Sequence, residues 1–332
     1  MQLLVAAPDK FRGTASASEV AAAMAAAAEG VGWACDRAPM ADGGEGLLET
    51  LGGRPRWARV RGPLDEAIEA EYRMLTGATA VVEMARAAGL ELAGGEEWND
   101  PMRATTAGVG DLIKTAVAAG ARRVIVGVGG SATTDGGLGC IRALEPHARL
   151  AGVELVVACD VSTTFVDAAD LFAPQKGASP AQVALLHRRL ERLAQVYEDE
   201  HGVDVRDIPG SGAAGGLAGG LAAIGAELVP GFDLVAEATG LADRIERADL
   251  VATGEGFLDE QSLRGKVVGG VLELAEAAGV PALVVVGRVV EGMRPGLRVV
   301  SLVDRFGEER ALTDTLACVE AVLRAQLSGP DS

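Results

Sequence analysis

MQLLVAAPDKFRGTASASEVAAAMAAAAEG, residues 1–30, predicts a strand, a loop and a helix in direct succession. The apolar run from Leu3 to Ala7 has the length of a buried strand, and the loop PDKFRG follows it. Ser16 and Glu19 have the spacing of a capping box, which opens an alanine-rich helix that extends to Glu29. The chain therefore begins with one unit of a strand-and-helix alternation.

The same alternation recurs further along the chain. Segments typical of a helix and then of a strand follow one another at 111–120 and 122–128 and again at 233–248 and 249–254, and apolar runs return at 280–287 and 297–303. These runs are continuously apolar, and no clear hairpin turn flanks the last two, which favours parallel sheets. We therefore expect an α/β fold whose parallel sheets are covered by helices on both faces.

Glycine-bearing loops with charged residues follow four of the predicted strands. They are PDKFRG (8–13), MADGGEG (40–46), GGSATTDGGLG (129–139) and TGEGFLDEQSLRGK (253–266). Ligands of parallel sheets gather at the carboxyl ends of the strands. Glycine lets backbone amides approach phosphate closely, and carboxylates can hold Mg²⁺. One such loop is an ordinary turn, but four together predict a site for phosphates and a metal ion.

Lysine is rare in this chain, and its placement is informative. Only four of the 30 basic residues are lysine, and Lys10, Lys176 and Lys266 lie in or beside these glycine-bearing segments, whereas Lys114 lies in a predicted helix. A chain that uses arginine for most cationic positions keeps lysine where a compact, flexible charge is needed, and phosphate binding is a common need of that kind. The alternative is coincidence, because 45 of the 332 residues are glycine.

Composition limits the classes of function. The length of 332 residues favours two domains, and the chain has no run approaching the roughly 18 apolar residues of a membrane helix. A net charge of −17 and only three Trp, two Tyr and six Phe argue against nucleic-acid binding. The N-terminus reaches Asp9 without a basic leader, and the four cysteines have no CxxC spacing. We therefore expect a cytoplasmic protein with reduced thiols, and we leave its oligomeric state open.

Several familiar motifs are absent or unconvincing. Residues 210–215 fit G-x-G-x-x-G and residues 127–132 fit its alanine variant, but the first follows no good strand, and chance matches are expected in a glycine-rich chain. Val267 follows Gly265-Lys266 where a Walker A motif needs Ser or Thr, so a kinase here would not be a P-loop enzyme. The three histidines lie in charged, surface-like contexts, which makes a serine triad improbable.

A set of segments in a fixed order makes a more specific resemblance. They are APDKFRGTASASEV (6–20), PMADGGEG (39–46), VVEMARAAGL (81–90), GVGGSATTDGGLG (127–139), ACDV (158–161), FAPQKGAS (172–179), PGSGAAGG (209–216) and TGEGFLDEQSLRGK (253–266). Together they resemble the bacterial type of the glycerate kinase family over nearly the whole chain. The resemblance implies an enzyme that phosphorylates D-glycerate with ATP and Mg²⁺.

The resemblance also implies a domain organisation. It predicts a flavodoxin-like parallel α/β domain built from both chain ends, residues 1–61 plus 238–332, and a second α/β domain, residues 62–237, inserted in the middle. Family members usually have Asn where this chain has Thr134, and a Thr-Asn-Pro-Leu stretch where it has Ser162 to Phe165. The segment between Cys140 and Leu155 is also shorter than in the family.

Phosphoryl transfer to a hydroxyl needs alignment, charge neutralisation and a carboxylate that accepts the hydroxyl proton. We assign the proton acceptor to Asp160, at the end of an apolar run, and contacts with anionic oxygens to Lys10, Arg12 and Lys176. The candidate metal ligands are Asp42, Glu45 and Glu255. The further candidate substrate or ATP contacts are Asp9, Gly43, Gly44, Gly130, Ser131, Gln175, Gly212, Gly215, Gly254 and Lys266.

Alternatives remain open for residues and for function. Each acidic residue could instead be a helix cap or turn residue, and Asp42 and Asp135 fit that role best. The chain could phosphorylate another small hydroxy acid. It could also be a weakened homologue that binds sugar acids as a regulator. The position of the phosphate on the product, C2 or C3, is not encoded in any motif.

Overall fold

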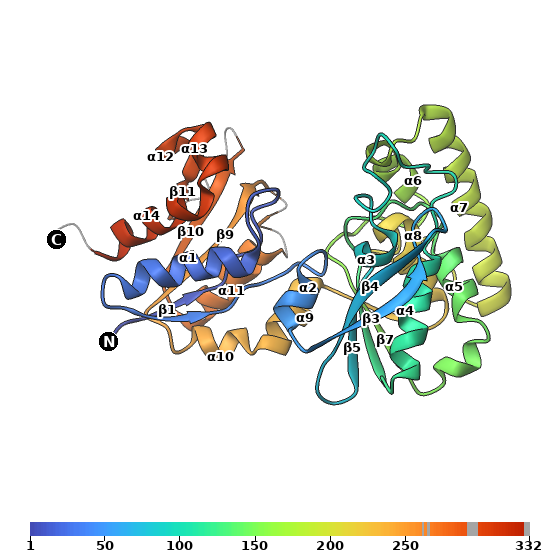
Figure 1. Ribbon diagram of the computed structural model, residues 1–332, viewed down its shortest axis with the longest axis horizontal. Coiled ribbons are helices and arrows are strands. Elements are labelled where there is room, and N and C mark those ends of the chain that lie inside the picture. Colours follow the sequence, from blue (N-terminus) through green and yellow to red (C-terminus); the bar gives the residue numbers. More distant parts are fainter. Residues whose placement is uncertain (261, 264–265, 291–297, 329–332) are drawn as a thin grey trace. The chain divides into compact units, whose positions relative to one another are not determined.

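The computed structural model describes residues 1–260, 262–263, 266–290 and 298–328. Residues 261 and 264–265 of the loop 253–266 and residue 297 of the last predicted strand lie outside the described residues. The chain forms two compact units (Figure 1). Met1–Asp42 and Phe232–Ser332 make the first, here called the terminal unit, and Gly43–Gly231 make the second, the inserted unit.

The terminal unit contains a five-stranded, entirely parallel sheet. Its strands are β1 (Leu3–Ala6), β2 (Ala34–Arg37), β9 (Leu250–Leu258), β10 (Ala282–Val289) and β11 (Val299–Ser301). In space they run β2-β1-β9-β10-β11, which is the flavodoxin order when the strands are numbered along the chain. The predicted α/β class, with a flavodoxin-like sheet built from both ends of the chain, is therefore confirmed.

Helices lie against this sheet on two faces (Figure 1). They are α1 (Ala17–Glu29), α9 (Gly231–Thr239), α10 (Leu241–Ile245), α11 (Val267–Ala278), α12 (Leu302–Phe306), α13 (Glu308–Thr313) and α14 (Thr315–Leu327). Side chains of α1 and α14 share one core with Leu4 of β1 and Val285 of β10. The next residue, Val286, instead packs with Val268 of α11. Alternate residues of β10 thus serve two cores, as period-two side-chain geometry requires.

The first predicted unit agrees closely with the structure. Strand β1 ends one residue before the predicted Ala7, and α1 ends at Glu29 as expected. Ser16 caps α1: its hydroxyl accepts the backbone N–H of Glu19, and the Glu19 carboxylate accepts the backbone N–H of Ser16 at 2.9 Å. The predicted capping box is therefore confirmed.

The inserted unit contains a six-stranded mixed sheet in the order β3-β4-β5-β6-β7-β8. Its strands are β3 (Arg54–Arg61), β4 (Ala67–Met74), β5 (Thr79–Glu83), β6 (Arg123–Gly127), β7 (Glu154–Ala158) and β8 (Glu227–Val229). Strands β5 to β8 pair in parallel, whereas β3, β4 and β5 pair antiparallel. Here the expectation of parallel pairing was wrong for two strand pairs.

A hairpin explains the difference. Strands β3 and β4 are joined by a short turn in which the N–H of Gly62 donates to the carbonyl of Glu66 and Asp65 has a positive φ of 74°. Apolar residues recur at every second position in β4, at Ile68, Ala70 and Tyr72. That alternation is typical of an antiparallel strand with one buried face, and Ala70 and Tyr72 are buried in the main core of the unit.

The helices of the inserted unit include one long amphipathic segment. They are α2 (Leu47–Leu51), α3 (Ala85–Ala88), α4 (Ala107–Ala118), α5 (Leu138–Leu144), α6 (Ala168–Phe172), α7 (Pro180–His201) and α8 (Ala213–Ala223), with 3₁₀ turns at His147–Leu150 and Pro174–Lys176. Helices α4 and α8 pack on the sheet in the main core. Helix α7 buries Leu186, Leu190, Ala194 and Tyr197, a stripe of one residue per turn, in a second core.

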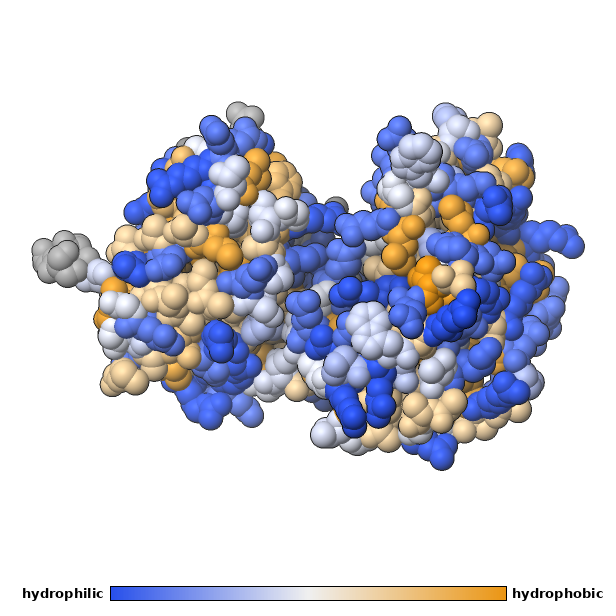
Figure 2. All heavy atoms as spheres, in the orientation of Figure 1, coloured by the Kyte–Doolittle hydropathy of each residue, from blue (hydrophilic) through white to orange (hydrophobic). Residues whose placement is uncertain are grey.

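The division between the units lies earlier in the chain than the expected boundaries after residues 61 and 237. Strand β3, residues 54–61, is hydrogen-bonded to β4 along its whole length, so it belongs with the inserted sheet. No helix among the described residues is long and apolar enough to cross a membrane. On the face in Figure 2, hydrophilic and hydrophobic residues are intermixed.

Candidate functional site

In the terminal unit, predicted site residues meet where the strand order reverses, between β1 and β9. The backbone N–H of Asp9 donates to the carbonyl of Gly254 at 2.9 Å, and the hydroxyl of Thr253 donates to the carbonyl of Ala7 at 2.8 Å. A Cβ on Gly254 would lie 1.7 Å from the carbonyl oxygen of Val285, so only glycine fits there. Such a reversal point is the usual ligand site of a flavodoxin-like sheet.

Asp9 and Glu255 at this point have strongly altered acidity. Burial raises the pKa of Asp9 to about 6, although Lys10 and Lys266 oppose the shift. Burial also raises the pKa of Glu255 to about 7, and the negative charges of Asp9 and Asp259 add to the effect. The negative charge of Asp9 thus contributes to the raised pKa of Glu255. Acidic groups with pKa values moved toward neutrality are characteristic of functional sites.

Glu255 also has an unsatisfied atom. Its Oε1 is buried and has no hydrogen-bond partner among the residues that the structure describes. Nearby, the backbone N–H and the hydroxyl of Ser262 both donate to Asp259 Oδ1, at 2.8 and 3.1 Å. A buried carboxylate oxygen with spare lone pairs is the kind of hard ligand that Mg²⁺ prefers.

The cations of this cluster lie at the same strand ends. Lys10 forms an ion pair with Asp42, with 3.7 Å between Nζ and Oδ1. The charge of Lys266, which caps α11, lowers the pKa of Asp9 and of Glu255. The Arg12 side chain is exposed, but its backbone N lies 3.0 Å from the position of a Cβ on Gly256, so the loop is held against β9.

In the inserted unit, Glu83 organises a second set of loops, although no sequence motif predicted a role for it. It ends β5, in register with Gly127 at the end of β6, which is in turn in register with Ala158 at the end of β7. Its buried Oε1 accepts the backbone N–H groups of Gly46 at 3.0 Å and Leu48 at 2.8 Å. Its Oε2 accepts from Arg86 Nε at 3.2 Å. Glu83 therefore fixes the loop that carries Gly43, Gly44 and Glu45.

Glycines let this loop pack against the neighbouring strand ends. A Cβ on Gly43 would lie 2.8 Å from the carbonyl oxygen of Ala158, and one on Gly127 would lie 2.6 Å from that of Gly43. A Cβ on Gly130 would lie 2.3 Å from Glu45 Oε1. The structure thus brings the predicted residues of 43–45 and Gly130 together.

Lys176 is buried beside Ser131. Its Nζ donates to Ser131 Oγ at 2.7 Å and to the carbonyl of Thr133 at 2.6 Å. Burial lowers the pKa of Lys176 to about 7, and the distant charge of Asp135 only partly opposes this. The Asn99 side chain holds the segment by donating to the carbonyl of Lys176 at 2.8 Å. Lys176 therefore releases its proton more readily than an exposed lysine does.

The backbone at the start of α8 requires the glycines that were predicted there as site residues. Ala214, Gly215 and Gly216 all have positive φ, so α8 begins with a left-handed kink. A Cβ on Gly215 would lie 2.0 Å from the carbonyl oxygen of Thr133, the same carbonyl that accepts from Lys176. A Cβ on Gly212 would lie 2.2 Å from the carbonyl oxygen of Thr164. Both glycines therefore allow close backbone contact with the loops around Lys176.

Asp160 follows β7, as its predicted role requires. Its Oδ1 accepts the backbone N–H of Gly231 at 2.6 Å. The side chain is half-buried, two residues beyond Ala158, whose carbonyl adjoins Gly43. This contact fixes the direction of the carboxylate but does not test whether it accepts a proton.

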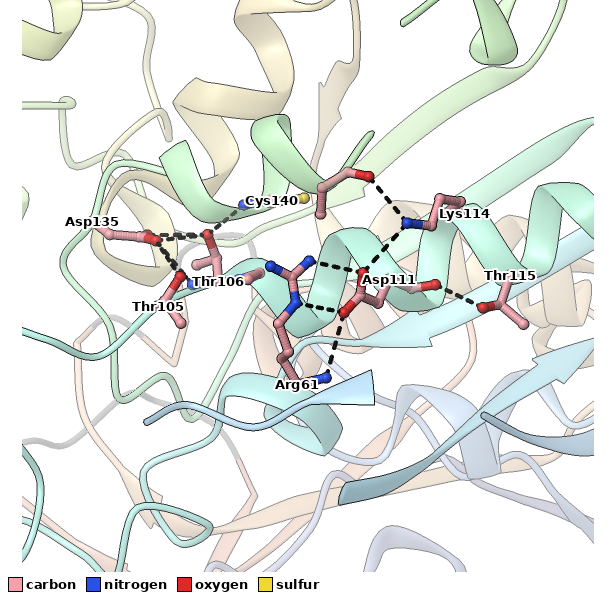
Figure 3. A network of polar contacts seen from close by, with 10 residues as sticks. Arg61, Thr105, Thr106, Asp111, Lys114, Thr115, Asp135 and Cys140 are labelled. Atoms are coloured by element: carbon pink, nitrogen blue, oxygen red, sulfur yellow. Dashed lines mark hydrogen bonds and ion pairs between the residues drawn. The ribbon is translucent and has the colours of Figure 1, made fainter. Parts of the chain in front are cut away.

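Asp135 has the structural role considered for it from the sequence (Figure 3). Its carboxylate accepts the hydroxyl and the backbone N–H of Thr106, each at 2.9 Å for Oδ2, and the backbone N–H groups of Gly137 and Gly139. These groups begin α4 and α5. Figure 3 also shows a separate ion pair, in which Arg61 donates two side-chain hydrogen bonds to the carboxylate of Asp111.

The structure divides the predicted catalytic residues between the two units. Lys10 belongs to the terminal unit, whereas Asp160 and Lys176 belong to the inserted unit. The side chain of Gln175 is exposed, although its neighbour Lys176 is buried. Of the candidate metal ligands, Asp42 and Glu255 lie in the terminal unit and Glu45 in the inserted unit. Within the described ranges, no three His, Cys, Asp or Glu side chains form a group that could hold a metal by themselves.

A cavity of about 440 Å³ lies beside Glu45 and Gly130. Glutamates dominate its charged lining, with Glu69, Glu71, Glu83 and Glu91 joining Glu45 against the single cation Arg86. Such a negatively charged wall repels phosphate. The lysine-bearing loops are therefore the better candidates for phosphate binding.

Comparison with known proteins gives a consistent result. The model of the "Glycerate kinase family" matches residues 4–148 and 145–325. The glycerate 2-kinase of Escherichia coli is 38% identical over 87% of this chain and 86% of its own length. The glycerate kinase of Bacillus subtilis is 37% identical over 86% and 85%.

A solved structure is similar over the full length of both chains. It comes from Salmonella typhimurium LT2 and is provisionally named glycerate kinase 2. It has a TM-score of 0.82 and 32% sequence identity, and the match covers 100% of each chain.

Proposed function

Because the chain belongs to the glycerate kinase family, we propose that it transfers the γ-phosphoryl group of ATP to a hydroxyl of D-glycerate, giving a phosphoglycerate. The observation that carries this proposal is the family match, which runs from residue 4 to residue 325. The two loop clusters, each with a lysine, support it, because an acidic protein needs local cations to bind two anionic substrates.

The lysines neutralise charge in this proposal. Lys10 and Lys176 contact oxygens of the phosphates or of the substrate carboxylate, and the pKa of Lys176, lowered to about 7 by burial, rises again when an anion approaches. The backbone amides at Gly43, Gly44, Gly130, Gly212 and Gly215 approach oxygens closely because no Cβ intervenes. Asp9, Arg12, Ser131, Gln175, Gly254 and Lys266 complete the proposed binding set.

The proton of the reacting hydroxyl passes to Asp160 in this proposal. A carboxylate suits the role, since phosphoryl transfer asks the protein mainly for positioning and one acceptor of a proton. The hydrogen bond from Gly231 to Asp160 Oδ1 holds the side chain in one orientation.

Mg²⁺ fits the acidic groups that are present. Glu255 offers a buried oxygen without a partner among the described residues, and Asp42 and Glu45 are the other proposed ligands. Kinase sites typically hold Mg²⁺ through one or two carboxylates together with substrate phosphates, so a three-carboxylate cage is unnecessary. When bound, the ion would neutralise phosphate charge.

The proposed setting is the cytoplasm, where ATP and reduced thiols are both found. None of the four cysteines forms a disulfide: Cys140 and Cys318 are buried and Cys35 and Cys159 partly so. This pattern is typical of a reducing compartment.

An ADP-release assay over a panel of hydroxy acids tests the proposal. We expect the highest kcat/KM with D-glycerate. A higher value with another hydroxy acid would reassign the substrate, and no turnover with any acid would favour a binding protein without kinase activity. A phosphorus NMR spectrum of the product then identifies the 2- or the 3-phosphate.

A further inference from the structure

A second cavity of the inserted unit has a different character. It is an open pocket of about 590 Å³, within the range of small-molecule sites. Met102, Leu138, Leu185 and Leu193 contribute apolar walls. Helix α7 forms one side, and the loop before α4 and the start of α5 form the other.

Four arginines line this cavity. They are Arg142 of α5 and Arg188, Arg189 and Arg192 of α7. Arg189 donates to the carbonyl of Met102 at 3.3 Å. The side chains of the other three are exposed and make no hydrogen bond or ion pair with any residue that the structure describes, although the chain as a whole has a charge of −17. Unpaired cations gathered in an acidic protein favour an anionic ligand.

The single acidic residue of the lining does not neutralise this group. Asp135 directs its carboxylate to Thr106 and to backbone N–H groups at the starts of α4 and α5 (Figure 3). Its lone pairs are therefore largely occupied. The positive charge of the arginines remains available to a ligand.

A buried hydroxyl supplies an independent observation. Thr134 lines the cavity and is 2% exposed. Its Oγ1 is buried and has no hydrogen-bond partner within the described part of the chain. Buried polar atoms are nearly always hydrogen-bonded, so this hydroxyl is an unsatisfied polar group within the wall of the cavity.

We propose that this cavity binds an organic anion with an apolar body. The guanidinium groups contact the carboxylate, sulfonate or phosphate group, because their planar N–H pairs match such oxygens. The leucine and methionine side chains cover the apolar body. None of the residues proposed for phosphoryl transfer lines this cavity, and the proposal does not depend on the proposed kinase activity.

Fluorescence titration of the full chain with anilinonaphthalene sulfonate, a sulfonate with an aromatic body, tests the proposal. We expect one saturable site in the wild type. The double variant Arg188→Gln/Arg192→Gln should weaken binding at least about 10-fold, the scale of one charge-assisted hydrogen bond. Leu185→Glu, at a position 39% exposed, should weaken it similarly by placing a negative charge at the cavity.

Arg54→Gln/Arg56→Gln is the matched control. It removes the same charge from exposed positions of β3, outside the cavity lining, and should leave the affinity unchanged. Circular dichroism verifies that each variant is folded. Equal binding by all variants, or no saturable binding by the wild type, would overturn the proposal. Displacement of the probe by ATP and Mg²⁺ would also overturn it, because the cavity would then belong to the nucleotide site.

Discussion

The buried carboxylate of Glu83 accepts the backbone N–H of Leu48 at 2.8 Å, across 35 positions of the chain. The same oxygen accepts the N–H of Gly46, so two amides at the start of α2 share one charged acceptor. Negative charge is favourable at the start of a helix, and here it also replaces a side-chain cap that Gly46 cannot provide. The position of the loop 43–45 therefore depends on a residue that makes no proposed contact with substrate.

Replacing Glu83 by Gln should lower both stability and activity. Its hydrogen bonds are buried and charge-assisted, so we expect the free energy of unfolding to fall by about 2 kcal/mol. We also expect kcat/KM to fall, because the loop with Gly43, Gly44 and Glu45 loses its anchor. Calorimetry and steady-state kinetics measure the two effects. Glu320→Gln, which removes an exposed ion pair with Arg324, should lower the free energy of unfolding by less than about 1 kcal/mol. Equal losses in the two variants would show that Glu83 does not anchor the loop.

Lys176→Met should reduce kcat/KM about 10-fold or more if Nζ contacts an anionic oxygen, the scale of one charge-assisted hydrogen bond. The same substitution at Lys10 and at Lys266 should reduce kcat/KM by a similar factor. Lys114→Met is the control, since Lys114 instead pairs with Asp111 and contacts the carbonyl of Ala143. Losses that are negligible at all four positions would remove the lysines from the proposed site.

Glu255→Gln should stabilise the ligand-free protein at high pH. The pKa of Glu255 is raised from an ordinary value of 4.5 to about 7, so the folded state holds the proton more tightly than the unfolded state. Stability from this group is present below pH 4.5 and is lost as the pH rises through 7. A tenfold change in a proton-binding constant corresponds to about 1.4 kcal/mol, so the variant should gain on the order of 3 kcal/mol relative to the wild type.

Denaturant unfolding at pH 5 and pH 8, without nucleotide, measures this gain. The variant should differ little from the wild type at the lower pH and exceed it at the higher one. Glu273→Gln, at an exposed position of α11, should change the stability equally at both. A variant that follows the wild type at every pH would show that the Glu255 carboxylate is well solvated.

Asp160→Asn should reduce kcat by about 100-fold or more while ATP binding changes little, because the amide keeps the shape of the side chain and removes its basicity. The amide oxygen can still accept the N–H of Gly231. Kinetics at varied Mg²⁺ concentration separate the possibilities. A raised Mg²⁺ requirement would make Asp160 a metal ligand and move the proton acceptor to Glu255 or Asp42, and unchanged turnover would make it a turn residue.

Local sequence signals predicted the parts of this protein that depend on local physics. The capping box of Ser16 and Glu19 specifies where α1 begins, and the apolar runs before Asp9 and Asp160 are buried parallel strands. Three of the four glycine-bearing loops follow strands as the alternation predicted, whereas residues 253–258 of the fourth belong to the strand β9. The hairpin of β3 and β4 departs from the expected parallel pairing, although the alternation at Ile68, Ala70 and Tyr72 is typical of an antiparallel strand.

Other features depend on contacts that no local pattern reports. Glu83 is the last residue of a strand, and only the packing of the loop 43–48 against it shows which backbone groups it binds. The burial of Lys176 is likewise not visible in the sequence. Its neighbours Pro174 and Gln175 are exposed, so no buried run marks the position. The four arginines of the second cavity come from two helices that are far apart in the sequence, and their meeting is a consequence of the tertiary structure.

The pairing of β1 with β9 has a consequence for synthesis of the chain. Leu4 lies opposite Leu250, so the central strand of the terminal unit acquires its second neighbour only after the whole inserted unit has been translated. Domains generally fold as units during synthesis. The complete inserted unit therefore leaves the ribosomal tunnel before β9 does, while β1 and β2 still lack this neighbour. During that interval the apolar side chains of β1 that are fully buried in the finished protein, Leu4, Val5 and Ala6, are exposed to chaperones and to other nascent chains.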